Sequence, residues 1–115
     1  MFKKSLILLS LVALVPVAAH AADIEKGKVA FGIRCASCHG PEGHGDGPVG
    51  KALPPGTVRN LSTGPFKYAT DAAKTKELLQ KGGAALGLNA LMPAQPDASD
   101  QELDNMVAYV MSLRK

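Results

Sequence analysis

Large aromatic side chains are scarce in this sequence. Among its 115 residues there is no Trp, and there are only three Phe and two Tyr, whereas Gly occurs 12 times and Pro eight times. A small domain already buries only a modest share of its chain surface. So few large side chains exclude a core built from aromatic packing alone, and a prosthetic group would supply the missing apolar mass.

Repeats, low-complexity tracts and strand patterns are also missing from the chain. No stretch alternates apolar and polar residues for long enough to predict a β-sheet. This absence argues against a sheet-based or repeat architecture and leaves an all-α fold as the expected class.

No apolar run is long enough for a permanent membrane anchor. The longest, from Leu6 to Ala19, contains Pro16 and falls short of the about 20 apolar residues that a membrane-spanning helix needs. Two lysines precede the run, and Ala19-His20-Ala21 offers a small-residue cleavage site, as in secretory signal peptides. We therefore expect residues 1–21 to be removed on export and residues 22–115 to form one domain in the periplasm, without stable membrane insertion.

Neither sign of charge dominates the chain. The formal net charge is +3, and two of the positive charges lie in the expected signal peptide. Basic residues prevail in residues 49–91, and acidic residues prevail from Met92 onward. This asymmetry predicts either electrostatic steering of a partner, led by Lys74, Lys76 and Lys81, or merely a solvated surface. No nucleic-acid partner is expected.

The two cysteines form the most specific motif in the sequence. Cys35 and Cys38 are separated by two residues, and His39 follows at once, which is typical of a c-type haem attachment site. In that chemistry each thiol adds to one haem vinyl group, and the adjacent histidine is aimed at the iron. The motif predicts one haem c, held by two thioethers, with His39 as an iron ligand.

Three other roles for these cysteines remain open at this point. A structural disulfide is compatible with an exported protein. A thioredoxin-like redox pair needs a βαβ context, which the sequence lacks. A zinc site would have to use the adjacent Cys38 and His39, with His44 as a further ligand.

Helix signals occur at both ends and in the middle of the expected domain. Asp23 is a candidate N-cap for a helix that runs to Cys35. Residues 71–81 are expected to form a short helix that Gly82 ends in a left-handed conformation. The intervening Gly40–Gly64 stretch is rich in Gly and Pro and is expected to be a loop without regular structure.

The last predicted helix has the clearest pattern. Ser99 to Glu102 form a capping box. Apolar residues then recur at steps of three and four, at Leu103, Met106, Val107, Val110 and Met111. Arg114 and Lys115 suit the negative pole of the helix dipole.

The order of these features resembles the class I cytochrome c family. The features are a helix leading into Cys35–His39, the Gly-rich stretch Gly40–Pro48, the Met92-Pro93 pair and a terminal helix. The resemblance covers essentially all of residues 22–115. It implies a small all-α cytochrome c fold, with three to four helices and long loops wrapped around one covalent haem.

The resemblance also implies a second iron ligand, for which Met92 is the choice. It lies in a non-helical stretch before a proline, whereas Met106 and Met111 fall on the apolar face of the last helix and are expected in the core. His44 is the competing ligand, although only a very short loop separates it from His39.

Further roles follow from the same resemblance. The carbonyl of Pro48 is expected to accept a hydrogen bond from the His39 ring, unless Pro48 is an ordinary turn residue. Gly27 and Phe31 are expected where the first helix crosses the last, with Tyr109 as the partner. As donors in a loop that passes the ring edge, Arg59 and Asn60 are candidates for binding the haem propionates.

With His39 and Met92 filling both axial positions, the iron has no open site for a substrate. The expected function is therefore periplasmic transfer of single electrons between a redox-protein donor and acceptor that bind transiently, by a monomer that is not an enzyme. Two alternatives remain: a haem c subunit of a periplasmic oxidoreductase or oxidase complex, and a ligand-binding sensor or weak peroxidase that releases Met92.

Overall fold

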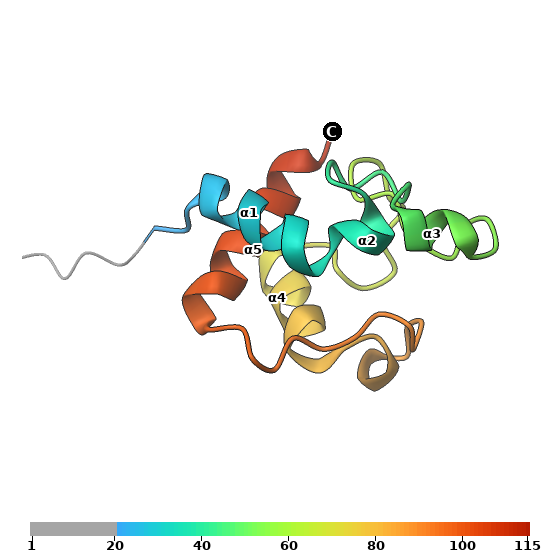
Figure 1. Cartoon of the computed structure of the whole chain (residues 1–115). Coiled ribbons are helices and arrows are strands. Elements are labelled where there is room, and N and C mark those ends of the chain that lie inside the picture. The colour runs from blue at the N-terminus through green and yellow to red at the C-terminus, as the bar shows by residue number, and fades with distance from the viewer. Residues whose placement is uncertain (1–20) are drawn as a thin grey trace, which may run out of the picture.

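A computed structural model describes residues 21–115, and the signal peptide expected over residues 1–21 lies almost wholly outside this part. The described residues contain no strand. Their helices are α1 (Ile24–Arg34), α2 (Ala36–His39), α3 (Pro48–Ala52), α4 (Ala72–Lys81) and α5 (Asp100–Leu113), with a 3-10 turn η1 (Ala84–Leu86) (Figure 1). The all-α class is confirmed, and no helix within residues 21–115 combines the length and apolar character needed to span a membrane.

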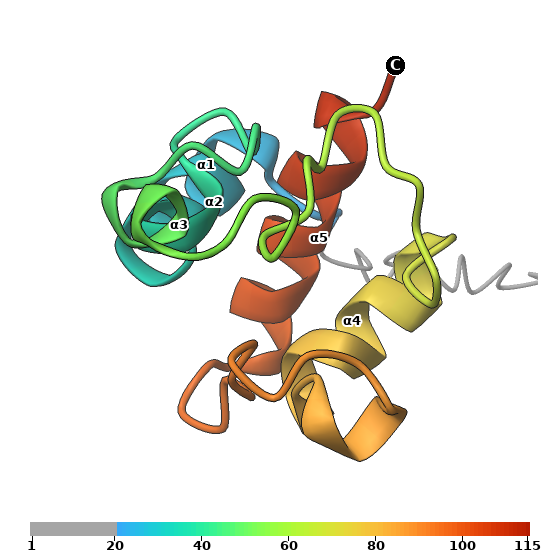
Figure 2. The same cartoon turned by 90° about the vertical axis from the view of Figure 1, so that its right-hand side faces the viewer.

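Helices α1 and α5 cross at the centre of the core, as both views show (Figures 1 and 2). Gly27 lies at the crossing, where a Cβ atom would collide with the backbone carbonyl of Asn105. Phe31 is fully buried and packs edge-on against Tyr109, with ring centroids 5.2 Å apart. The predicted crossing of Gly27 and Phe31 with Tyr109 is therefore confirmed.

The ends of α1 and α5 follow the predicted capping residues. The Asp23 carboxylate accepts a hydrogen bond from the Lys26 backbone N–H at 3.0 Å. The Ser99 hydroxyl accepts one from the Glu102 backbone N–H at 3.1 Å. The second half of the predicted capping box is wrong, because the Glu102 carboxylate pairs with Arg34 of α1 instead of accepting a hydrogen bond from the Ser99 backbone N–H.

The apolar face of α5 fills the core as its periodicity predicts. Its buried apolar residues are Leu103, Met106, Val107, Tyr109 and Val110. Met111 is partly buried and packs against them. Met106 and Met111 are thus core residues, as predicted.

The expectation of no regular structure over residues 40–64 is wrong at one place, because α3 lies inside it. Pro48 is the first residue of α3, a position where its missing N–H and fixed φ favour helix formation. Gly50 lets α3 approach α2 closely, since a Cβ there would overlap the Cys38 carbonyl oxygen. The same Gly and Pro residues that signal a loop therefore start and pack a short helix. Together with the separate helix α2, it brings the α-helices of residues 21–115 to five, against the expected three to four.

Helix α4 begins and ends near the predicted residues. The Asp71 carboxylate accepts a hydrogen bond from the Lys74 backbone N–H at 2.8 Å. Gly82 ends the helix with φ +80° and ψ 164°, a positive φ with extended ψ that is essentially limited to Gly, rather than the expected left-handed helical conformation. A Cβ on Gly82 would lie 2.8 Å from the Ala94 backbone nitrogen, so the end of α4 contacts the segment just after Met92.

Arg114 leaves the end of α5 instead of covering it. Its guanidinium donates to the backbone carbonyls of Ala69 and Thr70 and lies over the Phe66 ring, 4.1 Å from the centroid. The interaction predicted with the helix dipole is thus replaced by a link to the segment that precedes α4.

Candidate functional site

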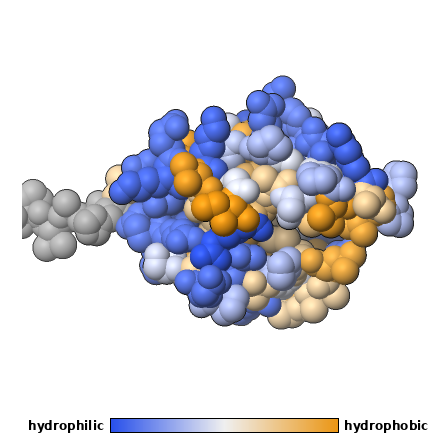
Figure 3. All heavy atoms as spheres, in the orientation of Figure 1, coloured by the Kyte–Doolittle hydropathy of each residue, from blue (hydrophilic) through white to orange (hydrophobic). Residues whose placement is uncertain are grey.

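A cavity of about 510 Å³ opens between α2, α4, α5 and the segments at residues 53–69 and 87–95. Its volume lies within the range of about 300–1,000 Å³ that is usual for small-molecule and cofactor sites. Figure 3 shows apolar residues around a hollow on the right of the molecule. Cys35, Cys38, His39 and Met92 all line this cavity, so the structure brings the four predicted site residues together.

The first two site residues stand at the junction of α1 and α2. The Cys35 carbonyl accepts hydrogen bonds from the backbone N–H groups of Cys38 and His39, at 3.3 and 2.9 Å, which forms one tight turn. No disulfide joins Cys35 to Cys38, so the alternative structural disulfide is not found in the described residues. Cys35 is only 8% exposed. Burial raises its thiol pKa to about 11, against the opposing effect of the Arg34 charge.

His39 is held by a backbone carbonyl. Its Nδ1 lies 3.2 Å from the carbonyl oxygen of Arg59, so the ring donates through Nδ1 and leaves the lone pair of Nε2 free. Burial lowers the pKa of His39, and the Arg59 carbonyl partly opposes this shift. This direction favours the neutral imidazole, which is the form that binds a metal ion.

The predicted role of Pro48 is wrong, because Arg59 supplies that carbonyl. Pro48 begins α3, and the preceding Gly47 donates its N–H to the Cys38 carbonyl at 3.2 Å. No side-chain pattern could have revealed Arg59 in this role, since the contact uses its backbone.

The two candidate propionate ligands behave differently. The side chain of Asn60 accepts hydrogen bonds from both the backbone N–H and the hydroxyl of Ser62, at 2.9 and 2.7 Å, and so closes a local turn. Asn60 does not line the cavity, whereas Arg59 does. Of this pair, only Arg59 is placed for contact with a ligand in the cavity.

Met92 is fixed by its backbone. Its carbonyl accepts a hydrogen bond from Gly83 at 2.9 Å, and its N–H donates to the Asn89 carbonyl at 3.1 Å. A Cβ on Gly83 would come 3.2 Å from the Cβ of Met92, so the backbone at Gly83 and the segment at Met92 are in close contact. Met92 itself is half-buried and borders the cavity.

The competing ligands have weaker positions. His44 is exposed and does not line the cavity. Met106 does line it, but is fully buried in the core face of α5. Residues 21–115 hold no group of three His, Cys, Asp or Glu side chains that could bind a metal ion, so the zinc alternative lacks a site there.

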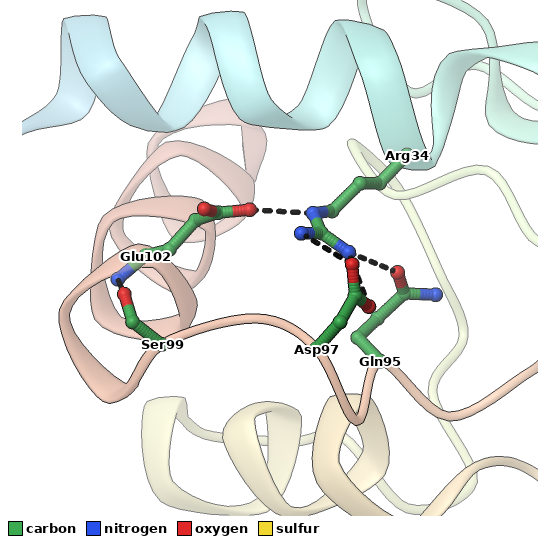
Figure 4. Close-up of polar contacts among 5 residues, drawn as sticks. All are labelled: Arg34, Gln95, Asp97, Ser99 and Glu102. Carbon is green, nitrogen blue, oxygen red and sulfur yellow. Dashed lines mark hydrogen bonds and ion pairs between the residues drawn. The ribbon is translucent and has the colours of Figure 1, made fainter.

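One group of charged and polar side chains beside the cavity is not indicated by the sequence. Arg34, the last residue of α1, contacts three side chains of the segment that follows Met92 (Figure 4). It donates to both oxygens of Asp97 at 2.9 and 3.2 Å, to the Gln95 oxygen at 3.2 Å, and to Glu102. These partners lie more than 60 residues away in sequence, so no local pattern could indicate them.

The charges in this group stabilise one another. Hydrogen bonds to Asp97 and Glu102 raise the pKa of Arg34. The Arg34 guanidinium in turn lowers the pKa of Asp97. The group is therefore a charge-assisted network in which the planar guanidinium bridges several acceptors.

The side chains around the cavity fit a covalently bound haem. Two thiols one turn apart, a neutral imidazole with a free Nε2 and a thioether border one largely apolar cavity. Thiols, imidazole and thioether are the groups that attach haem c and ligate its iron.

Comparison with known proteins agrees with this chemistry. A family model described as Cytochrome c matches residues 24–114. Cytochrome c-554(547) of Halothiobacillus neapolitanus is 32% identical over 97 residues, which cover 82% of this chain and all of that protein. A chain of the reducing HAO-like protein complex of Kuenenia stuttgartiensis has a similar fold, with a TM-score of 0.65 at 23% identity. That match covers 82% of this chain and 44% of the other.

The family match spans nearly all of the described residues, and the relative aligns over its whole length. Both agree with the Cys-x-x-Cys-His motif at residues 35–39 and with the all-helical fold. The chain therefore belongs to the cytochrome c family and carries a covalently attached haem c.

Proposed function

We propose that this cytochrome c is a periplasmic electron-transfer protein whose haem iron is ligated by His39 and Met92. The observation that carries the proposal is that both side chains line the cavity that also contains the two cysteines. His39 ends a helix, and Met92 comes from a non-helical segment that follows α4.

The residues of the chain have distinct tasks in this function. Haem c supplies a one-electron iron couple. The Arg59 carbonyl orients His39 so that Nε2 is the atom offered to the iron. The hydrogen bonds to Gly83 and Asn89 hold the backbone of Met92 beside the cavity. With His39 and Met92 holding the iron, no ligand position would remain for a substrate, which supports a carrier rather than an enzyme.

The ligand pair and the burial of the site together predict a positive midpoint potential. A thioether sulfur favours ferrous iron, and an apolar surrounding disfavours the extra charge of ferric iron. Equilibrium redox titration of the purified protein measures this value. A clearly negative midpoint contradicts His/Met ligation.

The proposed partners are a redox-protein donor and acceptor that bind transiently to the monomer. Leu91 is 64% exposed and lies beside Met92, so it offers an apolar contact at the edge of the cavity. A small interface of this kind suits rapid dissociation.

The lysine side chains expected to steer a partner are partly engaged within the chain. Lys76 lies between Asp100 and Asp104, with its Nζ 2.8 and 2.7 Å from their carboxylates. Lys81 pairs with a glutamate of its own helix. Intramolecular pairing offsets these two charges, so steering depends more on Lys74 than on the other two.

The test is the visible spectrum of the protein purified from the periplasm, oxidised and then reduced. We expect the sharp bands of a c-type haem and, in the ferric state, the weak far-red band of a methionine ligand. Met92→Ala should remove that far-red band and keep the covalent haem. Met106→Leu and Met111→Leu are the matched controls, since both residues belong to the core.

Each outcome has a direct meaning. Loss of the far-red band in Met92→Ala alone supports the ligand assignment. Loss of the band in Met106→Leu alone assigns that methionine instead. A wild-type protein with haem but without the band contradicts methionine ligation, and recovery only from the cytoplasm contradicts the periplasmic location.

A further inference from the structure

Arg34 joins the two parts of the chain that carry the proposed iron ligands. It lies at the end of α1, directly before Cys35, and its side chain is only 18% exposed. Its guanidinium reaches across to residues 95–102, as Figure 4 shows. One end of this contact is thus beside the attachment motif, and the other end lies on the segment that follows Met92.

The acceptors lie at successive points after Met92. Gln95 and Asp97 come three and five residues after it, and Glu102 is in the first turn of α5. The Gln95 backbone N–H also donates to the Leu79 carbonyl at 2.7 Å, which ties the same segment to α4. Within the described residues, Arg34 makes every hydrogen bond that links residues 93–99 to α1 or α2.

The geometry requires a guanidinium. The two terminal nitrogens meet the two oxygens of Asp97, while Nε points to Glu102 and one terminal nitrogen also reaches Gln95. A lysine ammonium is a single point on a flexible stem and cannot hold these acceptors in one plane. The contact therefore fixes the direction of the segment as well as its distance from α1.

We propose that Arg34 is a positioning residue that keeps Met92 on the haem iron by holding residues 95–102 against the end of α1. The inference rests on the proposed His39 and Met92 ligation. Arg34 acts through the backbone of residues 92–99, which we call the methionine segment. It thereby sets how often the Met92 thioether leaves the iron.

Added imidazole reports this opening without any measurement of electron transfer. Imidazole binds the ferric iron only in molecules from which Met92 has dissociated, so its apparent affinity is proportional to the open fraction. We expect Arg34→Gln to raise that affinity about tenfold at fixed neutral pH, equivalent to ~1.4 kcal/mol. Arg34→Lys should restore little of the difference, because it lacks the planar set of donors.

Two further variants separate positioning from general stability. Asp97→Asn removes a charge from the methionine segment and should also raise imidazole affinity. Lys76→Gln is the matched control: it removes pairs with Asp100 and Asp104, which belong to α5, and it leaves the contacts of Arg34 with Gln95, Asp97 and Glu102 in place. It should lower the free energy of unfolding and leave imidazole affinity unchanged.

The results distinguish this inference from the proposed function. Unchanged imidazole affinity in Arg34→Gln, or an equal rise in Lys76→Gln, overturns the role of Arg34 while leaving Met92 as the ligand. A wild-type protein without the far-red methionine band overturns both. Where Arg34→Gln fails to accumulate with haem, Asp97→Asn decides, because that side chain is 75% exposed and its change leaves the core intact.

Discussion

The two walls of the haem cavity are built in different ways. His39 lies in a helical wall, where Gly47 and Gly50 bring α3 close to the α2 backbone and Phe31 of α1 is fully buried. Met92 lies in a wall without regular structure, where backbone hydrogen bonds and the Arg34 network hold the segment. The first wall depends on close packing and the second on polar contacts between distant residues. The His39 side is therefore expected to be rigid, and the Met92 side is expected to be the one that opens.

The largest expected effect comes from breaking the helical wall at the cysteines. Cys35→Ala combined with Cys38→Ala removes both thioethers, so no haem should remain with the chain after extraction into acidified organic solvent. Absorption of the extracted protein measures this. Haem that stays bound in the double variant contradicts covalent attachment at these residues.

A smaller loss is expected from filling the contact between α2 and α3. Gly50→Ala places a Cβ against the Cys38 carbonyl, and overpacking of this kind costs about 1–3 kcal/mol of unfolding free energy. Gly32→Ala is the control, because its Cβ meets no atom within 4 Å in an exposed part of α1. That variant should gain about 0.5–1 kcal/mol. Guanidinium unfolding compares them, and equal stability of the two variants would refute the packing argument.

The N-cap of α5 provides a test at the junction between the methionine segment and the core. Ser99→Ala removes the acceptor of the Glu102 N–H and should cost about 1 kcal/mol of unfolding free energy. Ser99→Asp retains a capping acceptor and should cost little. If Ser99→Ala alters imidazole affinity as strongly as Arg34→Gln, the claim that the Arg34 contacts specifically hold Met92 in place is contradicted.

The smallest expected effect concerns acid. Arg34 lowers the folded-state pKa of Asp97 below the ordinary value of about 3.9, so the carboxylate contributes stability above that pH. The contribution is lost as pH falls through the lower, folded-state pKa. Asp97→Asn should therefore show a weaker fall in unfolding free energy over this acid range than wild type. Identical acid profiles in Asp97→Asn and wild type would rule out the linkage.

The sequence predicts best those features that are decided within a few residues. The capping side chains of Asp23, Asp71 and Ser99 fix helix starts through contacts three residues away. The sequence predicts Asp23 and Ser99 as caps, and it places the start of the middle helix at Asp71. The attachment motif is equally local. The glycine at the helix crossing, Gly27, was placed through the family resemblance, and its close contact with α5 is confirmed.

The missed features depend on contacts that leave no local pattern. The pair Gly47-Pro48 is compatible both with a turn and with the start of a helix. Composition alone could therefore not distinguish α3 from a loop. The Arg59 carbonyl that faces His39 is a backbone group, which any residue could supply. The hydrogen bonds of Arg34 form only when α1 packs across α5, so they depend on the tertiary fold. The iron ligands themselves and the signal peptide stay predictions.

The burial of Cys35 bears on the order in which the protein matures. Its sulfur lies in the same core cluster as Phe31 and Tyr109. Only a thiolate is a good nucleophile, and the folded environment holds this thiol in its neutral form. We therefore expect thioether formation at Cys35 while the chain is still open, before α1 closes onto α5. In that order haem attachment would precede completion of the fold, and the finished core would enclose the bond.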